Sequence, residues 1–222
     1  MKIIGLTDIH GDVAPILKMN GVLRQADLIL VAGDITHFGH QNRAKQVMDT
    51  IREINPNVLA VTGNCDYPDI DAYLNQENLS IQGKGLVREG IGFLGVGASL
   101  VTPFNTPNEM GEDDFERILN RGEGGLPVDI PMVIVSHQPP FKTAVDRLNS
   151  GDHVGAHAVR SFIARRAPLV CLTGHIHEAR GTDRIQDTVI INPGPTASGH
   201  YGVVDIDGER LVSAEIRTIF HD

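Results

Sequence analysis

The sequence predicts an α/β fold in which two sheets pack face to face and helices lie outside them. Three observations predict it. Near-continuous apolar runs recur along the chain, as in strands that are covered on both faces. Segments with helix start and stop signals separate the early runs. Further short strand-like runs joined by tight turns crowd the second half of the chain, and two packed sheets would accommodate them.

Five of the apolar runs share one format. Each is apolar and contains β-branched residues, and it is followed by a polar residue that can bind a metal and by residues typical of turns. Since ligands of open α/β sheets gather at the carboxyl ends of the strands, these side chains are expected at one edge. The runs are residues 2–7 before Asp8, 26–33 before Asp34, 57–63 before Asn64, 132–136 before His137 and 168–174 before His175.

Helices are predicted between the strands. Pro15 fits the first turn of a helix, and Pro56 and Pro168 stand where helices should stop. Residues 100–131, richer in Pro, Asn, Gly and acidic residues, predict an irregular excursion around one helix. The predicted helices are 13–24, 42–54, 68–74, 113–121 and 156–167, and the further predicted strands are 80–87, 90–97, 188–192, 200–206 and 210–219.

Two motifs near the ends of the chain have matching geometry. Asp8 and His10 are one residue apart, as are His175 and His177. Side chains on an extended chain repeat every second residue, so each pair points to one side. A single site built from both ends of the chain is therefore predicted.

The composition excludes several classes of protein. The chain of 222 residues is 41% apolar and 21% charged, and we expect a single globular domain, 1–222. The net charge of −9 disfavours an extended nucleic-acid interface. No apolar run approaches the roughly 18 residues of a membrane span, and the strand that begins at Lys2 argues against a signal peptide. A cytoplasmic protein with reduced Cys65 and Cys171 is expected.

Seven residues form the predicted metal centre. They combine carboxylate, amide and imidazole ligands, a set that suits Mn, Fe, Zn or Ni rather than Ca. Seven ligands are too many for one ion. With one bridging carboxylate they divide between two ions roughly 3.5–4 Å apart, a spacing that favours in-line displacement at phosphorus. The candidate ligands are Asp8, His10, Asp34, Asn64, His137, His175 and His177.

Five short motifs follow one another along the chain. They are Asp8-x-His10, Gly33-Asp34-x-x-His37, Gly63-Asn64-Cys65-Asp66, a lone His137 after a strand, and Gly174-His175-x-His177. This order resembles the calcineurin-like metallophosphoesterase superfamily, and Asn192-Pro193-Gly194 fits its small bacterial and archaeal phosphodiesterase branch. The resemblance implies a four-layer α-β-β-α sandwich of two mixed sheets flanked by helices, the metallo-dependent phosphatase-like fold. It also implies a metal-dependent phosphoric ester hydrolase that acts on a small phosphorylated substrate.

The resemblance further assigns roles to the seven ligands. A hydroxide between two divalent ions would attack phosphorus, and Asn64 would also contact the substrate. Manganese is the first expectation, with Fe, Ni, Zn or Mg as alternatives. The first metal would be held by Asp8, His10, Asp34 and His177, and the second by the bridging Asp34 with Asn64, His137 and His175.

One position departs from the pattern of the superfamily. Many members have a His after the metal-binding Asn, where it protonates the leaving group, but this chain has Cys65. A thiol with a pKa near ~8.5 donates less readily than an imidazolium near ~6.5. We therefore expect hydrolysis of diesters with good leaving groups and weak monoesterase activity. His37, Asp66 and His153 are candidate substitutes; a packed thiol at 65 and a solvated loop residue at 37 are the simpler alternatives.

Substrate contacts are expected in the loop after His137. Arg147 is a candidate clamp on a substrate oxygen, or else one partner of a surface ion pair. The Gly-rich turn 149–155, which contains His153, precedes a predicted helix. It is either a phosphate-binding turn or a plain connecting loop.

Other functions stay open. Some members of the superfamily keep the fold but act as non-catalytic protein-interaction scaffolds, and a phosphomonoesterase or nuclease is an alternative enzyme. Scaffolds tend to lose the metal set, and all seven ligands are present here, so we expect an enzyme. The acidic charge disfavours a nuclease. Exposed strand edges leave a homodimer open.

Overall fold

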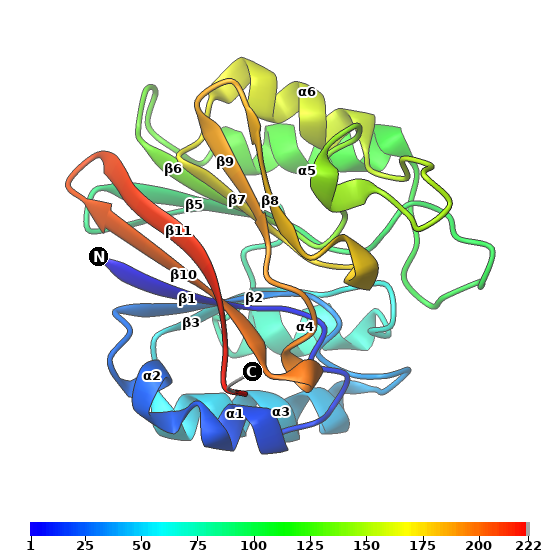
Figure 1. The fold of residues 1–222 in the computed structure, drawn as a ribbon, viewed down its shortest axis with the longest axis vertical. Helices are drawn as coiled ribbons and strands as arrows, with labels where there is room; N and C mark the ends of the chain where they lie inside the picture. The colour runs from blue at the N-terminus through cyan, green and yellow to red at the C-terminus, as the bar shows by residue number, and fades with distance from the viewer. Residues whose placement is uncertain (221–222) are drawn as a thin grey trace.

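The first sheet of the structure, a computed structural model that describes residues 1–220, joins both ends of the chain (Figure 1). It contains β1 (Lys2–Leu6), β2 (Leu28–Ala32), β3 (Val58–Val61), β10 (His200–Asp207) and β11 (Arg210–Thr218). The strand order is β11-β10-β1-β2-β3. β1, β2 and β3 run parallel, whereas β10 is antiparallel to both of its neighbours.

The second sheet contains the other six strands formed by residues 1–220. It contains β4 (Gly85–Arg88), β5 (Ile91–Val96), β6 (Met132–Ser136), β7 (Val170–Thr173), β8 (Gly181–Ile185) and β9 (Thr188–Asn192). Their order is β4-β5-β6-β7-β9-β8. The four central strands are parallel, and the two edge strands β4 and β8 are antiparallel. Both sheets are therefore mixed, as predicted.

Helices cover the outer face of each sheet (Figure 1). The first sheet packs against α1 (Ala14–Lys18), α2 (Asn20–Arg24), α3 (Gln41–Ile54) and α4 (Asp69–Gln76). The second packs against α5 (Glu112–Glu123) and α6 (His157–Arg166). A third apolar layer lies between the two sheets. The four-layer α-β-β-α architecture is thus confirmed.

Side-chain alternation explains how one strand supports two of these layers. All five residues of β2 are buried. Ile29 and Val31 pack toward the helices, whereas Leu28 and Leu30 pack toward the second sheet. Successive side chains of a strand point to opposite faces, so a strand covered on both sides must be apolar throughout.

Two predicted elements differ from the structure. The helix predicted over 13–24 is divided at Met19, whose backbone N–H is shared between the carbonyls of Pro15 and Ile16, at 3.0 Å from each; the bond to Ile16 is of the tighter 3₁₀ type. The strand predicted over 80–87 begins only at Gly85. Gly83 has a φ of 58°, a left-handed conformation that interrupts an extended chain.

One strand was not predicted. β8 lies at the edge of the second sheet and contains Thr182, Asp183 and Arg184, so it lacks the apolar run that marks the other strands. Edge strands pair on one side only and tolerate charged side chains.

No helix formed by residues 1–220 has the length and hydrophobicity that crossing a lipid bilayer requires.

Candidate metal centre

The carboxyl ends of β1, β2, β3, β6 and β7 bring the predicted ligands together. The ligand atoms of Asp8, His10 and His177 all lie within 4.8 Å of one another, and those of Asp8, Asp34 and His137 form a second such group. Nε2 of His177 lies 3.2 Å from Oδ1 of Asp8 and 3.4 Å from Nε2 of His10. The two motifs from opposite ends of the chain therefore meet, as the sequence predicted.

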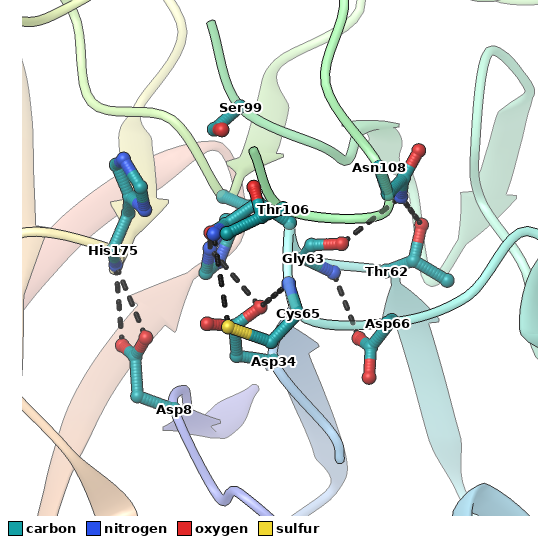
Figure 2. Close-up of polar contacts among 12 residues, drawn as sticks. Asp8, Asp34, Thr62, Gly63, Cys65, Asp66, Ser99, Thr106, Asn108 and His175 are labelled. Carbon is teal, nitrogen blue, oxygen red and sulfur yellow. Dashed lines mark hydrogen bonds and ion pairs between the residues drawn. The ribbon is translucent and has the colours of Figure 1, made fainter. Parts of the chain in front are cut away.

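Asp34 lies between the two sets of histidines. Its Oδ2 atom is 3.9 Å from Nε2 of His10, and its Oδ1 atom is 3.5 Å from Nε2 of His137. The backbone N–H of Cys65 donates to Oδ1 at 2.8 Å and fixes the carboxylate (Figure 2). One carboxylate thus presents a separate oxygen to each side of the centre.

His137 shows that the donor set fits a cation. Its Nδ1 atom donates to the carbonyl of Ala32 at 2.7 Å, so in the neutral ring Nε2 carries a lone pair. That lone pair faces the amide oxygen of Asn64 at 3.0 Å, while the amide nitrogen of Asn64 points to Sγ of Cys65 at 3.7 Å. Two acceptors directed at each other have no hydrogen to share. A divalent cation between them would satisfy both.

His175 lies on the same side as His137. Their ring centroids are 5.1 Å apart. The backbone N–H of His175 donates to the carboxylate of Asp8, with 3.2 Å to Oδ2, which Figure 2 shows from the side. All seven candidate ligands therefore lie around one centre.

The electrostatics of the carboxylates differ. Burial works to raise the pKa of Asp8, but the hydrogen bond with His177 and the nearby His137 outweigh it and hold that pKa well below its ordinary value. The same contact with Asp8 raises the pKa of His177. Burial, with Asp8 close by, raises the pKa of Asp34 to about 7 despite the opposing effect of His137. Protons therefore compete with cations at Asp34 and His177.

Two histidines are kept neutral by their surroundings. Burial lowers the pKa of His10 to about 4 and that of His175 to about 3. Nδ1 of His10 is buried and has no hydrogen-bond partner among residues 1–220. Both imidazoles consequently offer lone pairs at neutral pH, which metal binding requires.

The backbone is strained at the ligands. Asp8, His10, Asp34 and His175 have φ values of 51°, 51°, 47° and 67°, in the left-handed region that residues other than glycine rarely adopt. Such strain, roughly 1–3 kcal/mol per residue, clusters at functional sites. The sequence carries no direct signal for it except the glycines that precede Asp34 and His175.

These glycines are required by close packing. A Cβ at Gly33 would lie 2.5 Å from Nδ1 of His137, and one at Gly174 would lie 2.6 Å from Oδ2 of Asp8. Both distances are shorter than any real Cβ contact. The loops therefore approach one another as closely as the backbone allows.

The candidate proton donors occupy different environments. Cys65 is 8% exposed, and burial, with Asp34 nearby, raises the pKa of its thiol far above the ordinary value. His37 is exposed; its ring centroid is 5.5 Å from that of His10. The ligand atoms of His10, His37 and Cys65 lie within 4.8 Å of one another. Cys65 and His37 thus both border the centre.

Asp66 is turned away from this border. Its carboxylate accepts hydrogen bonds from the backbone N–H groups of Ile35, Thr36 and Gly63, at 2.8–3.0 Å, and from the hydroxyl of Thr36. It is fully buried. These contacts join the loop after β2 to the loop after β3, so Asp66 supports the loops of Asp34 and Asn64. Figure 2 shows the bond from Gly63.

Arg147 and His153 are engaged within their own loop. They form an isolated β-bridge with each other, and Nδ1 of His153 lies 2.6 Å from Oδ1 of Asp146. In the described part of the chain, neither side chain contacts a candidate ligand. The phosphate-binding interpretation of the turn 149–155 is also disfavoured, because Glu112 already accepts the first two backbone N–H groups of α6.

Two supporting residues were missed. Thr7 donates its hydroxyl to Oδ2 of Asp8 at 2.8 Å. Asn108, in the excursion, donates to the hydroxyl of Thr62 at 3.1 Å and to the carbonyl of Gly63 at 2.9 Å, as Figure 2 shows. A hydroxyl beside Asp8 could have been suspected from its position in the sequence. Nothing in the sequence around Asn108 indicates its partner, which lies about 45 residues away.

Comparisons with known proteins find a matching family model, a related sequence and a related fold. The family model for calcineurin-like phosphoesterases matches residues 1–179. An uncharacterized protein of Methanocaldococcus jannaschii is 37% identical over 202 residues, which cover 88% of each chain. A solved structure from Thermus thermophilus aligns with a TM-score of 0.77 at 17% identity and covers 99% of both chains.

A more distant structure shares the fold. It is described as a novel archaeal phosphodiesterase and aligns with a TM-score of 0.54 at 15% identity, covering 98% of this chain and 100% of its own.

Proposed function

This chain belongs to the calcineurin-like phosphoesterase family, and from that premise we propose that it is a phosphodiesterase with two divalent metal ions. The substrate would be a small phosphodiester or nucleotide. Asp8, His10, Asp34 and His177 would hold the first ion, and Asp34, Asn64, His137 and His175 the second. Manganese is the ion we would test first.

The position of Asp34 carries this proposal. Its two oxygens face His10 on one side and His137 on the other, and each histidine belongs to a different ligand group. A carboxylate in that position can bridge two ions. Each oxygen of Asp34 faces other candidate ligands on its own side of the centre. A single ion could bind the ligands of one side only, and those of the other side would have no cation.

The residues of the chain would prepare the centre for phosphoryl transfer. When bound, two divalent ions supply an acidified water as nucleophile and neutralise the charge that develops on the phosphoryl oxygens. His137 is oriented by the carbonyl of Ala32, and Asp8 by Thr7 and the backbone of His175. Such partners fix the ligands before the substrate arrives.

Cys65 supports a preference for diesters with good leaving groups. Its raised thiol pKa keeps it protonated at neutral pH, and a weak acid transfers a proton slowly to an alkoxide leaving group. A nitrophenolate needs no such help. The exposed ring of His37 beside His10 is the alternative donor.

The test compares turnover of bis(p-nitrophenyl) phosphate with that of p-nitrophenyl phosphate. Protein loaded with Mn, Ni, Zn or Mg is assayed with and without chelator, and its metal content is measured by mass spectrometry. We expect about two ions per chain and metal-dependent turnover that favours the diester.

Other outcomes of this assay would indicate a different function or a different metal centre. Faster turnover of the monoester would indicate a phosphomonoesterase. Two bound ions without turnover of either ester would count against the enzyme and in favour of a protein-interaction scaffold. One ion per chain at saturation would exclude the bridging role of Asp34.

A further inference from the structure

A polar hollow opens beside the candidate metal centre. Its volume is about 600 Å³. His177, a candidate ligand of the first ion, forms part of its wall, so the hollow and the centre share a side chain. The lining residues are His177, Glu178, Arg180, Pro195, Ser198 and His200.

Arg180 supplies the fixed positive charge in this hollow. Its Nη1 atom lies 2.7 Å from Nε2 and 3.0 Å from Nδ1 of His200. A guanidinium only donates, so the imidazole presents a lone pair to it. Among residues 1–220, no carboxylate lies within ion-pair distance of Arg180, and this includes the neighbouring Glu178.

The Asn-Pro-Gly turn positions Arg180. Gly194 has a φ of 81°, and a Cβ there would lie 2.9 Å from Cδ and 3.0 Å from Cγ of Arg180. The aliphatic part of the arginine therefore occupies the space that any other residue at 194 would need. Asn192 holds the turn: its Oδ1 accepts from the N–H of Gly194, and its Nδ2 donates to the carbonyl of Ile176, both at 2.9 Å. Arg180 is thus coupled to the loop of His177.

A second part of the wall is also held against the loop of the metal centre. It is formed by η3 (Thr196–Ser198), a short 3₁₀ turn. The backbone N–H of Thr196 donates to the carbonyl of Thr7 at 2.8 Å, and the N–H of Thr7 donates to the hydroxyl of Thr196 at 3.1 Å. The exposed Ser198 is consequently held beside the loop that carries Asp8.

We propose that this hollow binds a second phosphate group of the substrate while the scissile diester occupies the metal centre. The inference rests on the proposed phosphodiesterase function. The fork of a guanidinium matches phosphate oxygens, and the Ser198 hydroxyl adds a donor. Glu178 opposes an anion, but it is exposed, so solvent and salt screen its charge.

The proposal narrows the class of substrate. A phosphodiester that also carries a terminal phosphomonoester would engage both the metal centre and the hollow. A diester without a second anion would engage the metal centre alone. The chain should therefore prefer substrates such as a nucleoside 3′-diester with a 5′-phosphate.

A matched pair of chromogenic diesters tests this preference. Thymidine 3′-(p-nitrophenyl phosphate) is compared with the same ester bearing a 5′-phosphate, using the metal-loaded protein and measuring kcat/KM from release of nitrophenolate. We expect the 5′-phosphate to raise kcat/KM by about tenfold or more, mainly through KM, as a charge-assisted contact would. Arg180→Gln should reduce this ratio to about one, and Arg180→Lys should restore part of it.

The same assay includes a control variant, and two of its outcomes would contradict a proposal. Arg184→Gln removes an exposed arginine of the same region and should leave the ratio unchanged. Turnover of both esters at equal kcat/KM in the wild type would overturn the second-phosphate site and leave the phosphodiesterase intact. Turnover of neither ester with metals bound would instead refute the proposed function. The hollow would then be tested by calorimetric binding of thymidine 3′,5′-bisphosphate, and equal affinities of wild type and Arg180→Gln would overturn it.

Discussion

Asp34 directs one carboxylate oxygen toward His10 and the other toward His137, so its removal should affect both of the proposed ions. We expect Asp34→Asn to retain the fold, bind fewer than one ion per chain and lose diester turnover by roughly a thousandfold or more, equivalent to about 4 kcal/mol of transition-state stabilisation. Metal content by mass spectrometry and kcat/KM test this. Asp187→Asn, at an exposed turn, is the matched control. Full activity with two ions bound would exclude the bridging role.

Cys65 allows proton donation to be separated from packing. Cys65→Ala should keep both ions and change diester turnover by less than about threefold, because nitrophenolate leaves without protonation. Cys65→His should raise turnover of p-nitrophenyl phosphate relative to the diester. If Cys65→Ala instead loses diester activity while it retains the metals, the thiol takes part in the reaction.

The pKa values of the ligands predict how metal affinity depends on pH. Asp34, with its pKa raised to about 7, holds a proton just below neutrality, and the contact with Asp8 raises the pKa of His177, which favours its protonated form; both groups must release their protons when a cation binds. His10 and His175, with pKa values near 4 and 3, are already neutral. Affinity should therefore fall as pH is lowered from 8 to 6, by up to about tenfold per unit for each proton released. Calorimetry in buffers of different ionisation enthalpy counts those protons, and an affinity independent of pH would contradict the assignment.

At the scale of elements, the excursion before α5 supports the loop after β3. Asn108 donates to Thr62 and Gly63, next to the candidate ligand Asn64. Asn108→Ala should cost about 1–2 kcal/mol of unfolding free energy and reduce kcat by roughly tenfold, since Asn64 loses its support. Asn42→Ala, on the exposed face of α3, is the control. Loss of stability without loss of kcat would show that the excursion does not position Asn64.

The elements that were predicted are those whose own residues form a recognisable pattern. Apolar runs revealed β1, β2, β3, β6 and β7, and the ligands after them followed from that format. The sequence did not predict β8, whose polar residues are tolerated only because it is an edge strand. The hydrogen bonds of Asn108 to the loop after β3 and the packing of Arg180 against Gly194 are contacts between segments distant in the sequence. No local sequence pattern records them. The loop contacts of Arg147 and His153, with each other and with Asp146, are likewise not recorded by any local pattern.

For the whole molecule, removal of the metals should lower thermal stability. Buried Asp8 and Asp34 lie close together at the centre, and bound cations would offset the cost of their charge. A ligand at a hundred times its Kd contributes about 2.7 kcal/mol, which in a chain of this size corresponds to a Tm change of roughly 5–10 °C. Calorimetry with and without chelator measures it. An unchanged Tm would mean that the folded chain binds the ions no better than the unfolded chain does.

The division of the ligands between the two sheets has a consequence for biogenesis. Asp8, His10, Asp34 and Asn64 follow strands of the first sheet, whereas His137, His175 and His177 follow strands of the second. Each proposed ion needs ligands from both, so neither sheet on its own could retain the pair. Under the two-ion proposal, the ions are retained only after the apolar layer between the sheets has closed. A nascent or partly folded chain would hold cations weakly, which guards a newly made protein against capturing the wrong metal before its geometry can select the right one.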